Sequence, residues 1–291
     1  MKKLLMALLA VFLLVGVTAC GKDETTTEAP RTYVADGVYT AFEVSIHNDA
    51  PMVTEVSVTI ENDEITGYNI DALQSSFNDE NKVVWNEKTK KELGDDYGMV
   101  QYSDATLEWY EQAALIEAAW LANGYDSVTA DSETKVIDNV ADVTIKDGGY
   151  IALAAEAVQQ AKDGILKSYI VTEAHDGSAD IVWVELTVNE AGEATAMKLD
   201  TLQSTVSIVE DSPVLTWNEK TKQELGDDYG MVQYSDATLE WYEQANLITD
   251  YIVENGLPTD FAVADVDDLS DVTISTDSYE TVIKAVFELL K

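Results

Sequence analysis

The sequence has only one cysteine, two histidines and few basic residues. Because Cys20 has no second thiol to pair with, the chain can form neither an internal disulfide nor a thiolate metal cluster. His47 and His175 lie far apart in the sequence, so we do not expect a histidine zinc site or a Ser-His-Asp triad. The carboxylates show no separable acid–base pair. We therefore predict no catalytic residue and no metal ligand.

Positive charge is also scarce. The chain carries 55 acidic residues against 17 basic ones, which gives a formal net charge of -38. Such a surface repels nucleic acid and anionic lipid headgroups, so neither is an expected partner. The simplest explanation of the acidity is solubility in an ionic medium. Apolar residues make up 46% of the chain, too many for general disorder, so we expect it to fold.

The N-terminus contains an uncharged apolar run over residues 4–17, preceded by two lysines. This run is shorter than a membrane-spanning helix requires, and it predicts a signal peptide over residues 1–19. The run ends in Val-Thr-Ala-Cys20, which resembles the lipobox of bacterial lipoproteins. That resemblance implies lipid attachment at Cys20, a tether over residues 20–31, and anchoring to the outer face of a Gram-positive cytoplasmic membrane. A plain secretory signal with a chance cysteine is the alternative.

The rest of the chain contains a duplication. Residues 85–116 and 217–248 are nearly identical, and the sequences around them are homologous but divergent. A period of about 130 residues fits a whole domain, so we predict one domain over 32–163 and a second over 164–291. The sameness of the two blocks can reflect recent gene conversion instead of selection. The blocks differ only at Lys91/Gln223 and Ala114/Asn246.

Each copy begins with a predicted β-hairpin. Apolar and polar residues alternate over 56–60 and 65–70, with Asn62-Asp63 as a turn between them. The second copy repeats this pattern over 182–188 and 194–199.

Helices are predicted to follow each hairpin. In the first copy we expect a loop over 94–98, a helix capped by Ser103 or Asp104 and ending at Gly124, an extended segment over 140–145, and a final helix over 150–162. Strands followed by helices within one unit indicate an α+β fold. The second copy has its matching helix stop at Gly256 and its last helix from about Ser278 to the chain end.

Three features resemble the FMN-binding domain family, especially the double-domain lipoproteins of Gram-positive extracellular electron transfer. The first is Asp-Gly-Val-Tyr-Thr at residues 36–40, before the hairpin. The second is the block from Tyr97-Gly98-Met99 to the Glu-Trp-Tyr-Glu-Gln-Ala sequence of residues 108–113. The third is Asp-Val-Thr-Ile followed by a helix in each copy. The resemblance implies a surface flavoprotein that passes electrons outside the membrane and has no substrate pocket of its own.

In that family FMN is esterified through its phosphate to the last hydroxyl of Ser-Gly-Ala-Thr-x-Thr by a separate flavin transferase. The second copy matches this motif at Ser270 and Thr273, and Ser275 offers the acceptor hydroxyl. In the first copy Lys146 takes the place of Ser275 and cannot form the ester, although Thr144 keeps a hydroxyl. The resemblance therefore implies FMN at Ser275, an unmodified first copy, and a membrane electron donor as a partner. Both copies replace the motif's glycine with aspartate, which puts a carboxylate beside any phosphate.

Other functional interpretations have plainer alternatives. Tyr97 and Met99, with their counterparts Tyr229 and Met231, suit flavin contact or ordinary core packing. Asp-Val-Thr-Ile is also typical of a strand entering a helix. Aspartates 95 and 96 suit a calcium site or a solvated turn. At the level of function, the alternative is a non-enzymatic surface binding or spacer module whose flavin site has decayed.

Overall fold

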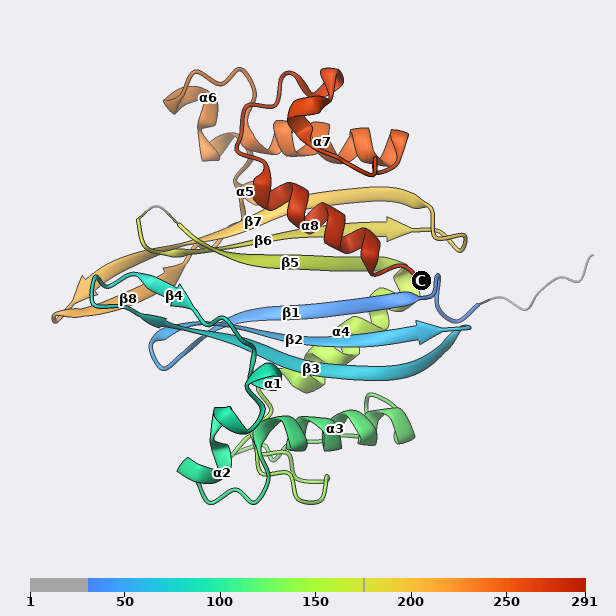
Figure 1. The fold of residues 1–291 in the computed structure, drawn as a ribbon, viewed down its shortest axis with the longest axis vertical. Helices are drawn as coiled ribbons and strands as arrows, with labels where there is room; N and C mark the ends of the chain where they lie inside the picture. The colour runs from blue at the N-terminus through green and yellow to red at the C-terminus, as the bar shows by residue number, and fades with distance from the viewer. Residues whose placement is uncertain (1–30, 175) are drawn as a thin grey trace, which may run out of the picture. The chain divides into compact units, whose positions relative to one another are not determined.

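The computed structural model describes residues 31–174 and 176–291 (Figure 1). The predicted signal peptide, the lipidation site Cys20 and nearly all of the tether lie outside the described residues. Residues 31–291 form one compact unit, and no described helix is long and apolar enough to cross a membrane.

Each repeat forms a four-stranded antiparallel sheet whose strands follow chain order. The predicted hairpins are β2–β3 and β6–β7, and the predicted α+β fold of two repeated units is confirmed. The first sheet contains β1 (Gly37–His47), β2 (Ala50–Glu61), β3 (Glu64–Phe77) and β4 (Val83–Trp85). The second contains β5 (Ile165–Glu173), β6 (Ala179–Val188), β7 (Ala194–Val209) and β8 (Ser212–Trp217).

The hairpin turns use residues that tolerate positive φ. Asn62 and Asp63 have φ of 54° and 63°, and Asn48 and Asp49 before β2 have 50° and 66°. Two consecutive positive φ angles give the turn whose twist matches that of the flanking strands. Asparagine and aspartate accept this backbone conformation more readily than most side chains, so these residues set the register of the first sheet.

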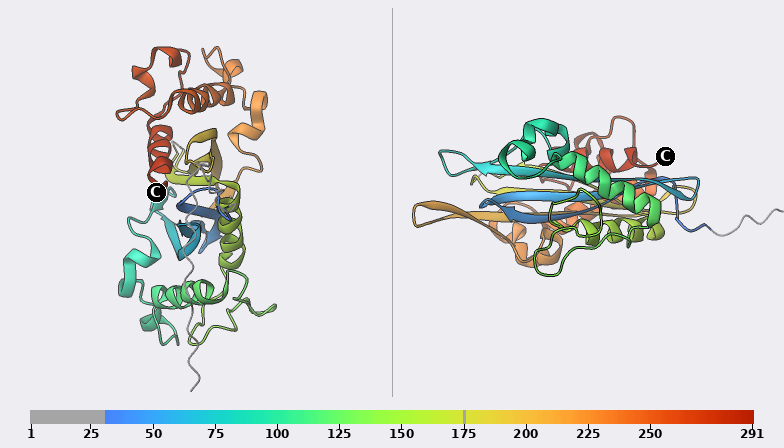
Figure 2. Two further views of the ribbon diagram at one scale, coloured as in Figure 1. Left: turned by 90° about the vertical axis from the view of Figure 1, so that its right-hand side faces the viewer. Right: turned by 90° about the horizontal axis from the view of Figure 1, so that it is seen from below.

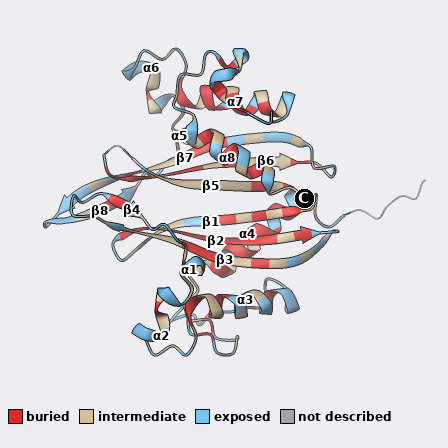
Figure 3. Ribbon diagram, in the orientation of Figure 1, coloured by how far each residue is buried: buried red, intermediate tan, exposed pale blue. Residues whose placement is uncertain are grey.

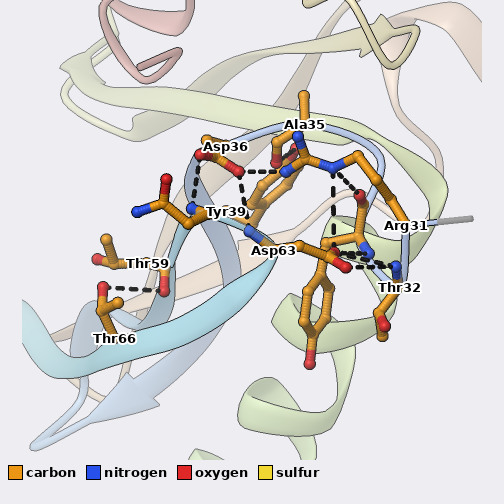
Figure 4. Close-up of polar contacts among 10 residues, drawn as sticks. Arg31, Thr32, Ala35, Asp36, Tyr39, Thr59, Asp63 and Thr66 are labelled. Atoms are coloured by element: carbon orange, nitrogen blue, oxygen red, sulfur yellow. Dashed lines mark hydrogen bonds and ion pairs between the residues drawn. The ribbon is translucent and has the colours of Figure 1, made fainter. Parts of the chain in front are cut away.

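The Asp36-Gly37 opening closes the β2–β3 turn (Figure 4). The Asp36 carboxylate accepts the N–H of Asn62 at 2.7 Å and of Asp63 at 3.3 Å, and it pairs with Arg31. The Asp63 carboxylate in turn accepts the N–H of Thr32 at 2.9 Å. Hydrogen bonds from backbone N–H groups hold the pKa of Asp63 below its usual value. In this structure the opening motif therefore ties the start of β1 to a neighbouring turn.

Two longer helices per repeat pack against each sheet. Helix α3 (Trp109–Asn123) contacts β3, and α4 (Tyr150–Asp163) contacts β1 and β2 (Figures 1 and 2). In the second repeat α7 (Trp241–Asn255) contacts β7, and α8 (Asp277–Glu288) contacts β5 and β6. Their buried residues join those of both sheets in one hydrophobic core (Figure 3).

The remaining helical elements are short. The short α-helices are α1 (Lys90–Leu93), α2 (Met99–Tyr102), α5 (Lys222–Leu225) and α6 (Met231–Tyr234). The 3₁₀ turns are η1 (Gly94–Tyr97), η2 (Gly226–Tyr229), η3 (Val263–Asp265) and η4 (Asp267–Leu269).

Three local predictions for the first copy need correction. The helix does not start at Ser103 or Asp104: α2 ends at Tyr102 and α3 starts at Trp109. Residues 103–108 separate the two helices, and the Glu108 carboxylate accepts the N–H groups of Met99 at 2.7 Å and Val100 at 3.1 Å at the start of α2. Residues 94–97 form a 3₁₀ turn, and residues 140–145 contain a turn instead of an extended segment. The predicted helix ends at glycines 124 and 256 and the final helix starting at residue 150 are confirmed.

Candidate functional site

A buried glutamine holds the Asp-Val-Thr-Ile segment of each repeat. In the second repeat the fully buried Gln244 accepts the N–H groups of Thr273 at 2.7 Å and Ile274 at 3.1 Å through its side-chain oxygen. Its side-chain nitrogen donates to the Leu239 carbonyl at 2.9 Å. The first two hydrogen bonds join helix α7 to the segment that precedes α8 and carries Ser275, and the third orients the Gln244 side chain.

The first repeat repeats this arrangement. Gln112 accepts the N–H groups of Thr144 at 2.6 Å and Ile145 at 3.1 Å, and its nitrogen donates to the Leu107 carbonyl at 3.0 Å. The same nitrogen lies 3.5 Å from the sulfur of Met99. Met99, and Met231 in the second repeat, therefore contact a buried amide of the scaffold.

Ser275 lies in the wall of a cavity of about 530 Å³, here named the Ser275 pocket. The pocket lies where strands of the second sheet meet the N-terminus of α8, and Ser275 itself is exposed. Its wall is rich in hydroxyl groups and charged groups. The residues used below are Glu173, Asp176, Asp180, Lys222, Ser275 and Tyr279.

Among the described lining residues, Lys222 contributes the positive charge of the Ser275 pocket. Its Nζ lies 5.2 Å from the ring centroid of Tyr229 and 5.3 Å from that of Trp241. Burial lowers the pKa of Lys222. Tyr229, one of the residues predicted to contact flavin, thus supports a lysine that reaches the pocket.

The first repeat contains the same lysine over two aromatic rings. Lys90 Nζ lies 5.4 Å from the ring centroid of Tyr97 and 5.3 Å from that of Trp109. Burial lowers its pKa to about 8. Sequence reasoning missed both lysines, although each belongs to the Lys-Thr-Lys sequence of its near-identical block.

Two further groups define the chemistry of the Ser275 pocket. The buried Tyr279 accepts a hydrogen bond at 3.0 Å from the indole nitrogen of Trp241, and burial raises the pKa of Tyr279. Asp180 has a buried oxygen, Oδ1, without a hydrogen-bond partner among the described residues. Burial raises the pKa of Asp180. A buried polar atom without a partner is uncommon, and a polar ligand in the pocket would satisfy it.

The corresponding place in the first repeat is arranged differently. Lys146 stands where Ser275 is, and Gly149 stands where the second repeat has Ser278. The Glu43 carboxylate lies against Gly149 so closely that a Cβ there would clash with it. Burial, together with the charges of Asp147 and Glu156, raises the pKa of Glu43. A carboxylate therefore already lies at the N-terminus of α4.

The other predicted residues lie apart from this pocket or at its edge. Thr144 and Thr273 are exposed, and each hydroxyl lies 3.3 Å from its glutamine oxygen. Ser270 lines a separate small cavity, so the structure does not bring it together with Ser275. Asp95 accepts a hydrogen bond from Tyr110 at 3.2 Å. Within residues 31–291, excluding 175, no three acidic, histidine or cysteine side chains are grouped as a metal site.

Comparison with known proteins adds no family. No protein-family model matches the sequence, and no curated protein matches it significantly. A distant structural match is the solution NMR structure of a protein from Clostridium thermocellum. The two are 23% identical, the match covers 43% of this chain and 91% of the other, and the TM-score is 0.31. A match at this level assigns no function.

Proposed function

We propose that the second repeat carries FMN, bound through its phosphate to Ser275, and that the protein passes electrons outside the membrane. The observation that carries this proposal is the position of Ser275, whose pocket also contains Lys222 and Tyr279. In the first repeat the same position belongs to Lys146, whose amine cannot form the phosphate ester. The proposed protein therefore carries one flavin.

The residues of the pocket suit the parts of FMN. The Ser275 hydroxyl supplies the ester oxygen, and the N-terminal turn of α8 offers backbone N–H groups to a phosphate. Lys222 adds a positive charge, and Asp180 offers a buried acceptor to a polar edge of the ligand. The bound flavin would supply the redox chemistry, while this chain would hold and orient it.

The proposal implies partners on the outer face of the cytoplasmic membrane. A flavin transferase would load Ser275, and a membrane protein would donate electrons. Lipid attachment at Cys20 would keep the flavin close to that donor. The anchor is proposed from the lipobox-like sequence alone.

A second candidate function is a surface binding or spacer module without flavin. The observation that favours it is the charge of the Ser275 pocket, whose described lining residues include three carboxylates, from Glu173, Asp176 and Asp180, and one lysine. Like charges disfavour a phosphate in the same site. In this alternative the pocket binds a ligand without a phosphate group.

Intact mass and visible absorbance of the full chain, co-expressed with a flavin transferase, distinguish the two functions. We expect wild type to gain the mass of one FMN and to absorb as a flavin. Ser275→Ala is expected to lose both signals, while Lys146→Ala, the matched substitution in the first repeat, is expected to keep them. Absence of added mass and of bound flavin in wild type would overturn the flavoprotein proposal.

A further inference from the structure

The two repeats meet around a pair of aromatic rings in contact, whose planes are tilted by 33°. Phe42 on β1 and Tyr169 on β5 have ring centroids 4.5 Å apart, and their strands run side by side (Figure 1). The two residues occupy equivalent positions, because Phe42 is the fifth residue after Gly37 and Tyr169 is the fifth residue after Gly164. Their neighbours across the hairpin are therefore equivalent too. Phe42 pairs with Glu55, and Tyr169 pairs with Trp183.

The two repeats differ at this interface because the first has Glu55 where the second has Trp183. On one side of the interface Trp183 packs edge-on against Phe42, with centroids 6.1 Å apart. On the other side Glu55 stands in the equivalent position and accepts a hydrogen bond from the Tyr169 hydroxyl at 2.7 Å. A carboxylate is much smaller than an indole, and a cavity of about 590 Å³ lies beside it.

The wall of this inter-repeat cavity is mainly apolar. Its apolar lining residues are Val38, Leu73, Ile170, Val171 and Leu289. A volume of this size, at an interface between two folded repeats, is typical of small-molecule sites.

Glu55 is the only acidic residue that lines the cavity among the described residues. The single basic residue there, Lys167, is already paired with Glu156 at 3.3 Å and Glu185 at 3.4 Å. Among the described residues the Glu55 carboxylate has no ion-pair partner and is hydrogen-bonded only to the neutral Tyr169 hydroxyl, and burial raises the pKa of Glu55. A positively charged group beside it would supply the missing compensation.

We propose that the inter-repeat cavity binds an organic cation with an apolar body, whose ammonium group pairs with Glu55. The apolar wall would cover the body of the ligand, and the carboxylate would select its charge. The net charge of -38 raises the local concentration of cations and disfavours anions. Cation binding here is independent of flavin binding, because the cavity and the Ser275 pocket share no described lining residue.

Calorimetric titration of the full chain with hexylammonium, hexanol and hexanoate tests the proposal, because these probes share one apolar body and differ in the head group. We expect hexylammonium to bind most tightly. Glu55→Gln is expected to weaken hexylammonium at least tenfold and to leave hexanol nearly unchanged. Equal affinity of wild type for hexylammonium and hexanoate, or an unchanged affinity in Glu55→Gln, would overturn the proposal.

The second repeat supplies a matched control for the cavity itself. Glu55→Trp introduces the residue that the second repeat has at position 183, so the indole is expected to fill the cavity and abolish hexylammonium binding. Ser57→Thr, another cavity-lining position, is a conservative control expected to keep binding within threefold. Circular dichroism establishes that each variant is folded. A folded Glu55→Trp that binds hexylammonium like wild type would place the site elsewhere and overturn the proposal.

Discussion

The two repeats share a scaffold and differ at the place where a ligand would lie. In both, a buried glutamine holds Asp-Val-Thr-Ile, a lysine lies over a tyrosine and a tryptophan, and a glutamate caps a short helix. All of these side chains belong to the near-identical block. The residues that distinguish the two sites lie outside it. They are Glu43/Ile170, Lys146/Ser275 and Gly149/Ser278.

This difference shows what the near-identical block does. Its side chains fix where the segment before the last helix lies. They do not determine which residue that segment carries at the candidate site. Ser275 in one repeat and Lys146 in the other are presented by the same scaffold. Folding therefore accounts for the near-identity of the block, and the residues that differ between the two sites lie outside it.

The largest expected effect comes from the buried glutamine. Gln112→Leu and Gln244→Leu each leave two backbone N–H groups and one carbonyl without their partner, so we expect either to lower the free energy of unfolding by about 3 kcal/mol. Urea denaturation of the full chain measures this.

The same two variants distinguish an effect on the stability of the fold from an effect on FMN loading at Ser275. Gln244→Leu is expected to reduce FMN loading at Ser275, because it frees the segment that carries the serine, whereas Gln112→Leu is expected to leave loading unchanged. If the free energy of unfolding fell by less than about 1 kcal/mol in both variants, the structural role assigned to the glutamines would be contradicted.

A smaller effect is expected from the buried lysine of the first repeat. The pKa of Lys90 in the folded protein is about 8, below its ordinary value of 10.5. The unfolded chain therefore binds more protons between these values, and the free energy of unfolding rises with pH in this window. From about pH 7.5 to about pH 9.5 we expect a gain of about 2 kcal/mol from Lys90.

Lys90→Met is expected to remove this contribution. Lys222→Met tests whether the second repeat behaves in the same way, since burial also lowers the pKa of Lys222. Tyr68 and Tyr150, with pKa values raised to about 12, oppose the gain only at higher pH. Urea denaturation at the two pH values measures how much the free energy of unfolding rises between them. If this rise were as large in Lys90→Met as in wild type, Lys90 would not be its source.

The sequence predicted the elements that local patterns determine. Alternation and an Asn-Asp turn were enough for β2–β3, and glycines marked the ends of α3 and α7. The cap of α2 was missed because Glu108 binds N–H groups eight and nine residues earlier, where no local pattern points to it.

The candidate site was predictable only in part. Similarity to a family motif singled out Ser275, but the glutamine that positions it lies far away in the sequence. A lysine is rarely buried, so no pattern predicted the position of Lys90 over aromatic rings. The contact between Glu55 and Tyr169 joins residues 114 positions apart and depends on how the repeats pack.

The smallest expected effect concerns the two positions at which the near-identical blocks differ. In the first repeat Lys91 Nζ lies 2.6 Å from Glu117, and the Glu117 carboxylate accepts the N–H of Ile70 at 2.6 Å. In the second repeat Gln223 donates to the Leu199 carbonyl at 2.9 Å and to Asn246 at 3.2 Å. The two differing positions thus contact each other there, and each block suits its own neighbours.

Lys91→Gln removes the half-buried ion pair with Glu117, and we expect it to lower the free energy of unfolding by about 1 kcal/mol. Adding Glu117→Thr, which supplies the residue found at position 249, is expected to recover part of this loss because no carboxylate is left unpaired. A double-mutant cycle in urea measures the coupling. If the two changes were additive and each cost less than about 0.5 kcal/mol, the differences would be neutral drift after gene conversion. Measurable coupling would instead mean that each copy of the block has adapted to its own repeat.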